Sequence, residues 1–422
     1  MKNKIANNRS LWIFIAVCWM AYSFSYIGRL NFSASMADMT ASGVILKSQA
    51  GIVSTCFFIC YGCGQLLSGW LGDKVIPRYL VFAGLLGASV CNFGMSFAPP
   101  LWLMAVLWSF NGLSQALLWA PIMRAVSDRI PKEKIPTACT VLATTMAGGT
   151  LMAYILSAVL ISLYGWTAAF ISGTLGPLSA ALIWIAVTTK IEKDTDKNGI
   201  AEEITIAAEE DEEEVPHDEV PNDIFKLLAV SGLFILCFSS GVQGILKDCM
   251  STWVPTFITD MFDLGSVISI LTGTMLPIFG LFGPYFANKL FMKTRDELSS
   301  LFVLFAVSAA ALAVLMLFGK YSLIISIIAL AITYACSLGQ NMFTVGSIPM
   351  YFSKVGKVSI ITGIMEAASY LGTASLTFIT GHLVENFGWT FVMVVWFALA
   401  VLAAVATIFA KRRWNKFRRN LF

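Results

Sequence analysis

Twelve stretches of roughly 20 mostly apolar residues constrain this chain more than any other feature of its sequence. A helix of that length and composition crosses a lipid bilayer, because its backbone N–H and C=O groups are satisfied within the helix. Only 13% of the 422 residues are charged, about half the share in an average soluble domain. The sequence therefore predicts an all-α membrane protein and excludes a soluble enzyme. The twelve transmembrane helices are expected at residues 11–35, 49–71, 79–98, 101–124, 137–162, 167–188, 224–258, 264–288, 298–318, 322–347, 356–381 and 388–410.

The positive charges fix the expected orientation of these helices. With an even number of spans both termini lie on one side of the membrane, and 24 of the 28 lysines and arginines fall on that side. The opposite side has only Lys47 and Lys320. Because lysine and arginine accumulate in cytoplasmic loops, both termini are expected in the cytoplasm, with the chain in the plasma membrane, which in a bacterium is the inner membrane.

One long hydrophilic segment divides the chain. Residues 189–223 include the acidic run 209–214, and this composition is typical of a solvated cytoplasmic linker. Residues 1–188 are therefore expected to form an N-terminal bundle of six helices, and residues 224–410 a C-terminal bundle of six. The basic cytoplasmic tail, residues 411–422, is expected to contact anionic lipid headgroups.

The two halves resemble each other in sequence. The Gly-Trp-Thr of residues 165–167 recurs at residues 388–390, 223 positions later, and the same offset relates Gly149 to Gly372. These matches are weak singly, but they fall in the same order in both halves and indicate a duplicated six-helix unit. Parallel repeats of this kind mark a large transporter fold that binds its ligand near the bilayer midplane between the halves. We therefore expect two pseudo-symmetric six-helix bundles.

Two cations lie inside apolar stretches. Arg29 in the first span and Lys247 in the seventh occupy nearly equivalent places, so a pseudo-twofold axis would bring them together across a central cavity. Burying either residue costs roughly 2.5–3.5 kcal/mol unless a partner or water compensates, and both are predicted to bind an anion. The alternative for Arg29 is an internal ion pair with Glu366. The alternative for Lys247 is a pair with Asp248, although adjacent residues on a helix face each other poorly.

The neighbours of these cations leave alternatives open. Tyr22, Tyr26 and Arg29 are spaced i, i+4 and i+7 and share one helix face, so the two phenols either line the cavity or pack against a neighbouring span. Glu366 is a carboxyl inside an apolar span, which must be paired, protonated or wetted. It is a proton-coupling group, a ligand for a substrate amine or hydroxyl, or the partner of a buried cation.

The segment after the second span carries a motif. Residues 69–78 read G-W-L-G-D-K-V-I-P-R and resemble the loop 2–3 motif of the major facilitator superfamily; the D-K-x-x-P-R pattern resembles, more narrowly, the organophosphate:phosphate antiporter family. That resemblance implies the twelve-helix fold and a substrate phosphate gripped by two basic residues, with glycerol-3-phosphate or hexose phosphates exchanged for inorganic phosphate. The matching residues it assigns to the substrate site are Tyr22, Tyr26, Arg29, Trp119, Lys247 and Tyr370.

The chain also departs from that family's pattern. Gln65, which is itself predicted to bind the substrate, stands where the family usually has a lysine in the second span, and Leu30 replaces a second basic residue after Arg29. With Asp248 and Glu366 added, the predicted substrate site is less positive than the sites of its relatives. A monoanion, a zwitterion or a protonated phosphate monoester therefore fits it better than a dianionic phosphate ester.

Three further charged residues are assigned to a gate and not to the substrate site. Asp73, Lys74 and Arg78 follow the second span on the predicted cytoplasmic side. A charge cluster at helix ends that forms in one state and separates in the other would set the access equilibrium.

Together these features predict a secondary transporter of a small organic anion that works by alternating access. A sugar phosphate or polyol phosphate exchanged for inorganic phosphate is the first hypothesis, and a proton-coupled symporter of a sugar acid or zwitterion that uses Glu366 is the second. A sensor with this fold is a third class. The expected partners are the substrate, phosphate or a proton as coupling ion, and the bilayer. We expect a monomer with no cofactor, no metal, no catalytic residue and no nucleic-acid partner.

Overall fold

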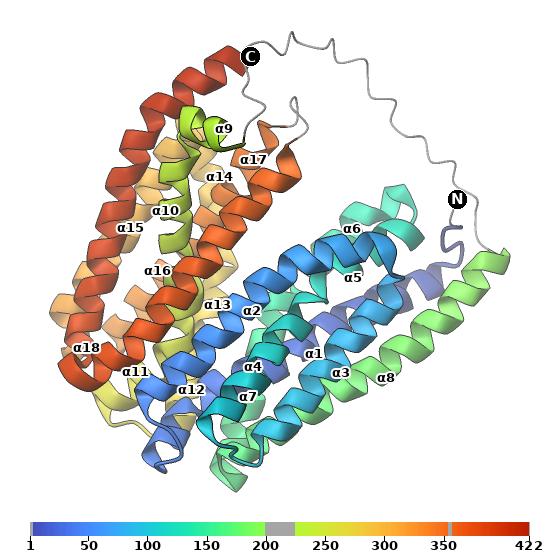
Figure 1. The fold of residues 1–422 in the computed structure, drawn as a ribbon, viewed down its shortest axis with the longest axis horizontal. Helices are drawn as coiled ribbons and strands as arrows, with labels where there is room; N and C mark the ends of the chain where they lie inside the picture. Colours follow the sequence, from blue (N-terminus) through green and yellow to red (C-terminus); the bar gives the residue numbers. More distant parts are fainter. Residues whose placement is uncertain (1–2, 199–223, 353–356, 422) are drawn as a thin grey trace. The chain divides into compact units, whose positions relative to one another are not determined.

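The computed structural model describes residues 3–198, 224–352 and 357–421. Within these ranges the chain consists of helices joined by short turns, and no strand is formed (Figure 1). The prediction of an all-α fold is confirmed. The acidic run 209–214, which the sequence assigns to a linker, lies outside the described residues.

The chain divides into two compact units. Unit 1 comprises Met1–Asp38 and Ile59–Val215, and unit 2 comprises Met39–Phe58 and Pro216–Phe422. The turn that joins the first two helices, with the beginning of the second helix, therefore packs with the C-terminal half of the chain. The expected division into segments 1–188 and 224–410 does not anticipate this exchange of residues.

Unit 1 holds the helices of the N-terminal half. Pro77 opens α3 at its first turn, where the missing N–H has no intrahelical partner to lose. The last helix, α8, continues well past residue 188, so the beginning of the expected linker is helical. The helices are α1 (Asn8–Ala41), α2 (Lys47–Lys74), α3 (Pro77–Met95), α4 (Leu101–Ala116), α5 (Trp119–Arg129), α6 (Ile135–Ala143), α7 (Thr145–Tyr164) and α8 (Trp166–Asn198).

Unit 2 holds the helices of the C-terminal half. Two of its long helices contain π-helical turns, Ile245–Cys249 between α10 and α11 and Met342–Ser347 between α16 and α17. Such turns often occur at functional sites. The helices are α9 (Ile224–Ser231), α10 (Leu233–Gly244), α11 (Met250–Phe262), α12 (Ser266–Gly273), α13 (Met275–Gly280), α14 (Phe282–Thr294), α15 (Glu297–Phe318), α16 (Leu323–Asn341), α17 (Ile348–Met350) and α18 (Val358–Leu421).

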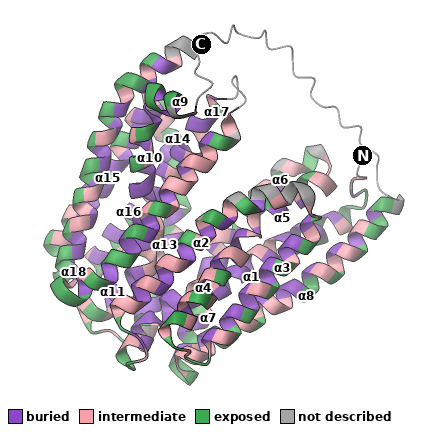
Figure 2. Cartoon of the chain, in the orientation of Figure 1, coloured by how far each residue is buried: buried purple, intermediate pink, exposed green. Residues whose placement is uncertain are grey.

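The helices account for the predicted spans. In the described residues, 10 stretches are long and apolar enough to cross a membrane. One of them, Ile360–Arg418, is broken at Gly388 and therefore holds two helices. The 28-residue helix α2 corresponds to the predicted span 49–71 and is not among those 10 stretches. Side chains such as Phe93, Trp102 and Leu163 are exposed on the helices, as lipid contact requires, and Figure 2 shows such exposed positions along both units.

Matching glycines support the duplication. Gly165, between α7 and α8, has φ +79°, and Gly388, inside α18, has φ +74°. With ψ near 175° at both positions, this backbone conformation is accessible essentially only to glycine. Each glycine therefore lets the chain leave one helix and enter the next directly, in the equivalent place of each repeat.

A second pair of glycines brings helices together inside each unit. A Cβ on Gly149 of α7 would lie 2.8 Å from the backbone oxygen of Ser23 on α1. A Cβ on Gly372 of α18 would lie 2.4 Å from the backbone oxygen of Gly241 on α10. Small residues allow such backbone contact, a principal source of helix association in membranes.

The tail is a helical continuation of α18 that docks on unit 2. Trp414 and Phe417 are buried, and Phe417 stacks on Phe352 with ring centroids 5.4 Å apart. Arg412, Arg413 and Lys416 are exposed. These three exposed cations are therefore available for the expected contact with lipid headgroups, whereas other cations of the tail are engaged within unit 2.

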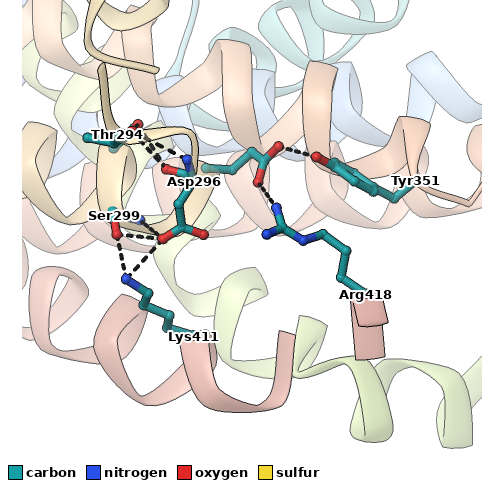
Figure 3. Close-up of polar contacts among 8 residues, drawn as sticks. Thr294, Asp296, Ser299, Tyr351, Lys411 and Arg418 are labelled. Carbon is teal, nitrogen blue, oxygen red and sulfur yellow. Dashed lines mark hydrogen bonds and ion pairs between the residues drawn. The ribbon is translucent and has the colours of Figure 1, made fainter. Parts of the chain in front are cut away.

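Two further tail cations, Lys411 and Arg418, pair with carboxylates at the start of α15 (Figure 3). Lys411 Nζ lies 3.0 Å from Asp296 Oδ2, and Arg418 Nη1 lies 3.2 Å from Glu297 Oε2. The hydroxyl of Tyr351 also donates to Glu297, whose side chain is almost fully buried. These contacts fasten the end of α18 to the α14–α15 turn.

Candidate functional site

Arg29 lies on α1 in unit 1, among aromatic rings. Its guanidinium carbon is 5.7 Å from the ring centroid of Tyr26 and 4.6 Å from that of Tyr61 on α2. A guanidinium over an aromatic face is attracted by the ring quadrupole, more strongly where water is excluded. The rings thus offset part of the cost of placing this cation inside an apolar helix.

The predicted aromatic residues of unit 1 form one cluster with Arg29. Tyr22 packs edge-on against Tyr26, with centroids 5.5 Å apart, and against Trp119 at the start of α5, with centroids 4.8 Å apart. The packing alternative is therefore realised for Tyr22, and Tyr26 contacts Arg29, whereas the lining of a cavity by the two phenols stays a prediction.

Tyr61 is the residue of this cluster that sequence reasoning missed. It is buried on α2, one turn before the half-buried Gln65. The signal was present in the sequence, since residues four apart share a helix face. Gln65 lies on the same face of α2 as Tyr61, and its binding of the substrate stays a prediction.

Lys247 and Asp248 lie in the π-helical turn Ile245–Cys249 of unit 2. Lys247 Nζ is 3.2 Å from Asp248 Oδ2, so the pair that helix geometry disfavoured does form. The argument from regular helix spacing was wrong here because the turn is not α-helical. The contact is an ion pair without hydrogen-bond geometry, and Oδ2 accepts no hydrogen bond within the described residues.

Glu366 and Tyr370 on α18 complete the cluster in unit 2. Lys247 Nζ lies 5.8 Å from the ring centroid of Tyr370, and the charge of Lys247 acts on the Glu366 carboxyl. Both side chains are partly buried. This cluster therefore holds one cation and two carboxylates, an excess of one negative charge when all three are ionised.

Arg29 and Lys247 belong to different units, so their meeting across a cavity stays a prediction. Within each unit, however, a basic residue lies on the first long helix of the repeat beside tyrosine rings. The structure brings together Tyr22, Tyr26, Trp119 and Arg29 in unit 1. In unit 2 it brings together Lys247, Asp248, Glu366 and Tyr370.

The predicted gate residues separate into two groups. Arg78 at the start of α3 pairs with Glu192 of α8, Nη1 to Oε2 2.8 Å, and stacks on Tyr79. Both partners belong to unit 1, and Glu192 was not anticipated. The side chains of Asp73 and Lys74 lie outside the described part of the structure.

A second polar cluster of unit 2 holds the beginning of α2. Lys47 Nζ is 2.6 Å from Asp260 Oδ2 on α11, and the same oxygen accepts a hydrogen bond of 2.7 Å from Trp389 Nε1. Glu385 Oε1 accepts from the backbone N–H of Ser48, 2.9 Å away. A carboxylate at a helix N-terminus is stabilised by its unpaired N–H groups and dipole. Sequence reasoning treated Lys47 only as a loop cation.

The long apolar helices indicate a multi-pass membrane protein. Residues 18–357 match the Major Facilitator Superfamily. Because that match covers most of the chain, the chain belongs to this superfamily. It is a secondary transporter of that type and not an enzyme.

Known proteins resemble the chain in sequence and in fold. A probable hexose phosphate transport protein of Chlamydia trachomatis is 24% identical over 427 residues, covering 96% of this chain and 91% of that protein. Membrane sensor protein UhpC of Escherichia coli K12 is 34% identical over 97 residues, 23% of this chain and 22% of that protein. A crystal structure of a bacterial homologue of the human lysosomal transporter Spinster matches the chain with a TM-score of 0.73 at 14% identity. The match covers 97% of this chain and 99% of that chain. At this identity the likeness shows a shared fold and nothing about function.

Proposed function

We propose that this chain exchanges a small organic phosphate, a sugar phosphate or polyol phosphate, for inorganic phosphate by alternating access. The observation that carries the proposal is the pair of basic residues, Arg29 and Lys247, each inside an apolar helix of its own repeat and each beside tyrosine rings. A guanidinium offers a planar fork of donors that matches phosphate, and an ammonium adds a compact charge. The hexose phosphate transport protein to which the chain is similar supports this substrate class.

Charge coupling explains exchange in this proposal. An empty carrier that turned over would have to move the charged groups of Arg29 and Lys247 between environments without a ligand bound to them, which costs free energy, whereas a bound anion offsets that cost. Transport then proceeds only when an anion is bound in each direction. Inorganic phosphate serves as the counter-substrate because it offers the same oxygens to Arg29 and Lys247.

The carboxylates limit the charge of the substrate. Arg29 and Lys247 carry two positive charges, and Asp248 and Glu366 two negative ones, so the four groups sum to zero when all are ionised. A monoanionic phosphate is therefore favoured over a dianion. A substrate hydroxyl finds an acceptor in Asp248 Oδ2, which accepts no hydrogen bond within the described residues.

Orientation and gating complete the proposal. In this proposal both termini lie in the cytoplasm and the chain lies in the plasma membrane, and the 24 cations on the side of the termini support that orientation. Asp73, Lys74 and Arg78 act at the cytoplasmic gate, where the pair of Arg78 with Glu192 anchors α3 to α8. The chain acts as a monomer.

A second candidate is a proton-coupled symporter of a sugar acid or zwitterion. The observation that favours it is Glu366, a partly buried carboxyl whose charge interacts with that of Lys247. Protonation of Glu366 would remove one of the two negative charges near Lys247 and so favour binding of an anion, which couples one proton to one substrate.

Proteoliposomes separate the two candidates. Vesicles are loaded with phosphate or with an inert buffer and offered labelled glucose-6-phosphate, glycerol-3-phosphate or hexuronates. Uptake that requires internal phosphate supports the exchanger. Uptake that follows an imposed pH gradient without internal phosphate, and is lost in Glu366→Gln, supports the symporter. Ligand binding without uptake under either condition would overturn both and favour a sensor, the class of the relative from Escherichia coli.

A further inference from the structure

Buried amide side chains contact the backbone of α1 next to Arg29. Asn92 of α3 and Asn111 of α4 both donate through Nδ2 to the backbone oxygen of Gly28, each at 2.9 Å. Gln115, one turn further along α4, donates to the backbone oxygen of Ser25 at 3.1 Å. All three amides are at least 97% buried. Two neighbouring helices thus hold α1 within one turn of its basic residue.

Two glycines leave room for these amide side chains. A Cβ on Gly28 would lie 2.9 Å from Asn92 Nδ2, and one on Gly173 would lie 2.4 Å from Asn31 Nδ2. Asn31, on α1 itself, donates to Asn92 Oδ1 at 2.6 Å and to the backbone oxygen of Ala169 on α8 at 3.2 Å. Asn92 is therefore oriented from both ends, and α3, α4 and α8 all grip the same turn of α1.

Only one of the two polar atoms of the Asn111 side chain has a partner. Its Nδ2 donates to Gly28, whereas its Oδ1 is buried and accepts no hydrogen bond within the described residues. A buried acceptor without a partner costs free energy, and an apolar residue of similar shape would remove that cost. The hydrogen bond from Asn111 to α1 is therefore present despite an unsatisfied oxygen on the same side chain.

Unit 2 also has a buried amide beside its basic residue, but this amide lies on the helix of the cation itself. Gln243, one turn before Lys247, is fully buried on α10. Its Nε2 donates to the backbone oxygen of Ser337 on α16 at 3.3 Å, and its Oε1 accepts from Ser369 Oγ on α18 at 3.2 Å. A Cβ on the adjacent Gly244 would lie 2.2 Å from the backbone oxygen of Ser369. Gln243 thus ties the helix of Lys247 to two neighbours, as Asn31 ties α1 to α3 and α8 in unit 1.

Such contacts fix the rotation of a helix about its axis. Apolar surfaces let membrane helices turn and slide with little change in contact, whereas hydrogen bonds across helices define one setting. A side-chain tip lies roughly 5–6 Å from the helix axis, so a turn of about 20° moves it by about 2 Å. A ligand must be held to within about 0.5 Å of its productive position.

We propose that Asn92, Asn111 and Gln243 are positioning residues that aim Arg29 and Lys247 at the transported anion. They touch backbone and neighbouring helices and act through the basic residues. The inference rests on the proposed function, because it presumes that Arg29 and Lys247 bind the anion.

The test measures phosphate exchange in proteoliposomes of the full chain, together with the thermal midpoint in detergent. Asn111→Leu is expected to raise the KM for inorganic phosphate about tenfold, the size of a change of about 1.4 kcal/mol, while the thermal midpoint stays the same or rises. A merely structural residue would show the reverse, a lower midpoint with an unchanged KM. Gln243→Met is expected to raise KM similarly.

Ser89→Ala is the matched control. Ser89 lies on α3, one turn before Asn92, and donates to the backbone oxygen of Thr174 on α8 at 2.8 Å. Its removal deletes a helix–helix hydrogen bond that does not involve α1, and KM should not change.

A double-mutant cycle separates this inference from the proposed function. If Asn111 acts through Arg29, its substitution adds little in an Arg29→Lys background. A normal KM in Asn111→Leu, or its full effect in that background, overturns the positioning role and leaves the exchanger standing. Wild-type vesicles that neither bind nor exchange phosphate overturn both proposals.

Discussion

At the scale of single residues, the pair of Lys247 with Asp248 limits what the proposed site could bind. Lys247 Nζ lies 3.2 Å from Asp248 Oδ2, and the carboxylate offsets part of the positive charge of Lys247 that would otherwise attract an anion. Regular helix geometry could not predict this contact, because a π-helical turn changes which neighbours meet. The identity of both residues was readable from the sequence, whereas their pairing was not.

Removal of the Asp248 charge should strengthen phosphate binding. In Asp248→Asn the ammonium of Lys247 is no longer shared, so the KM for inorganic phosphate is expected to fall about three- to tenfold, a change of up to about 1.4 kcal/mol. Exchange kinetics in proteoliposomes measure this. If Asp248 also accepts a substrate hydroxyl, the KM for glycerol-3-phosphate falls less than that for phosphate. An unchanged KM for both would show that Asp248 takes no part in the site.

Asp296, outside the predicted spans, gives a pH-dependent contribution to stability. Burial opposes its ionisation, but hydrogen bonds from Ser299 and the charge of Lys411 outweigh it, so the pKa of Asp296 lies below its ordinary value of 3.8. A carboxyl with a lowered pKa stabilises the folded state above its ordinary pKa, and this contribution is lost as the pH falls through the lowered value.

Asp296→Asn keeps the N-cap of α15 and removes the charge. It is expected to lower the free energy of unfolding by up to about 1 kcal/mol at pH 7, as for a partly exposed ion pair. Thermal midpoints of the two proteins in detergent should differ equally at pH 7 and pH 5 and converge only below about pH 4. Convergence between pH 6 and pH 5 would contradict the lowered pKa.

At the scale of helices, the glycines show how much of the helix arrangement the sequence could predict. The repeated Gly-Trp-Thr predicted equivalent positions in two repeats, and the structure gives Gly165 and Gly388 nearly the same backbone angles. The lengths of the apolar stretches predicted the spans, because the thickness of the bilayer sets the length of a helix that crosses it. The internal breaks of α4–α5 and α12–α13–α14 were not predicted, because an apolar run reads the same whether or not its helix is interrupted.

Substitution of either glycine tests the backbone argument. Gly165→Ala and Gly388→Ala are each expected to lower the free energy of unfolding by about 1–3 kcal/mol, because the conformation is strained for any residue with a Cβ. No atom lies within 4 Å of the added Cβ at either position, so the cost is in the backbone. Thermal or denaturant unfolding in detergent measures it.

Gly265 provides the control for that experiment. It has equally open surroundings but φ −57°. Gly265→Ala should therefore be neutral or slightly stabilising. Equal losses in all three variants would place the effect in side-chain packing or in the helix ends, and not in the left-handed backbone.

At the scale of the whole molecule, hydropathy and the motif at residues 69–78 predicted the superfamily, and the match over residues 18–357 confirms it. The assignment of residues 39–58 to unit 2 was beyond the sequence. It depends on long-range contacts such as Lys47 with Asp260 and Ser48 with Glu385, which no local pattern encodes. The candidate site was predicted as a set of residues, and the two local clusters emerged only from the structure.

The central claim is that Arg29 and Lys247 bind the anion whose exchange drives the transporter. Phosphate–phosphate exchange in proteoliposomes of Arg29→Lys and Lys247→Ala tests it most directly, with Lys320→Ala, which alters a cation outside both clusters, as control. Each site variant is expected to lose at least about tenfold in kcat/KM, since lysine cannot reproduce the bidentate fork of arginine. The control should exchange normally. If Arg29→Lys and Lys247→Ala both exchange phosphate like the wild type, the two-cation site is wrong.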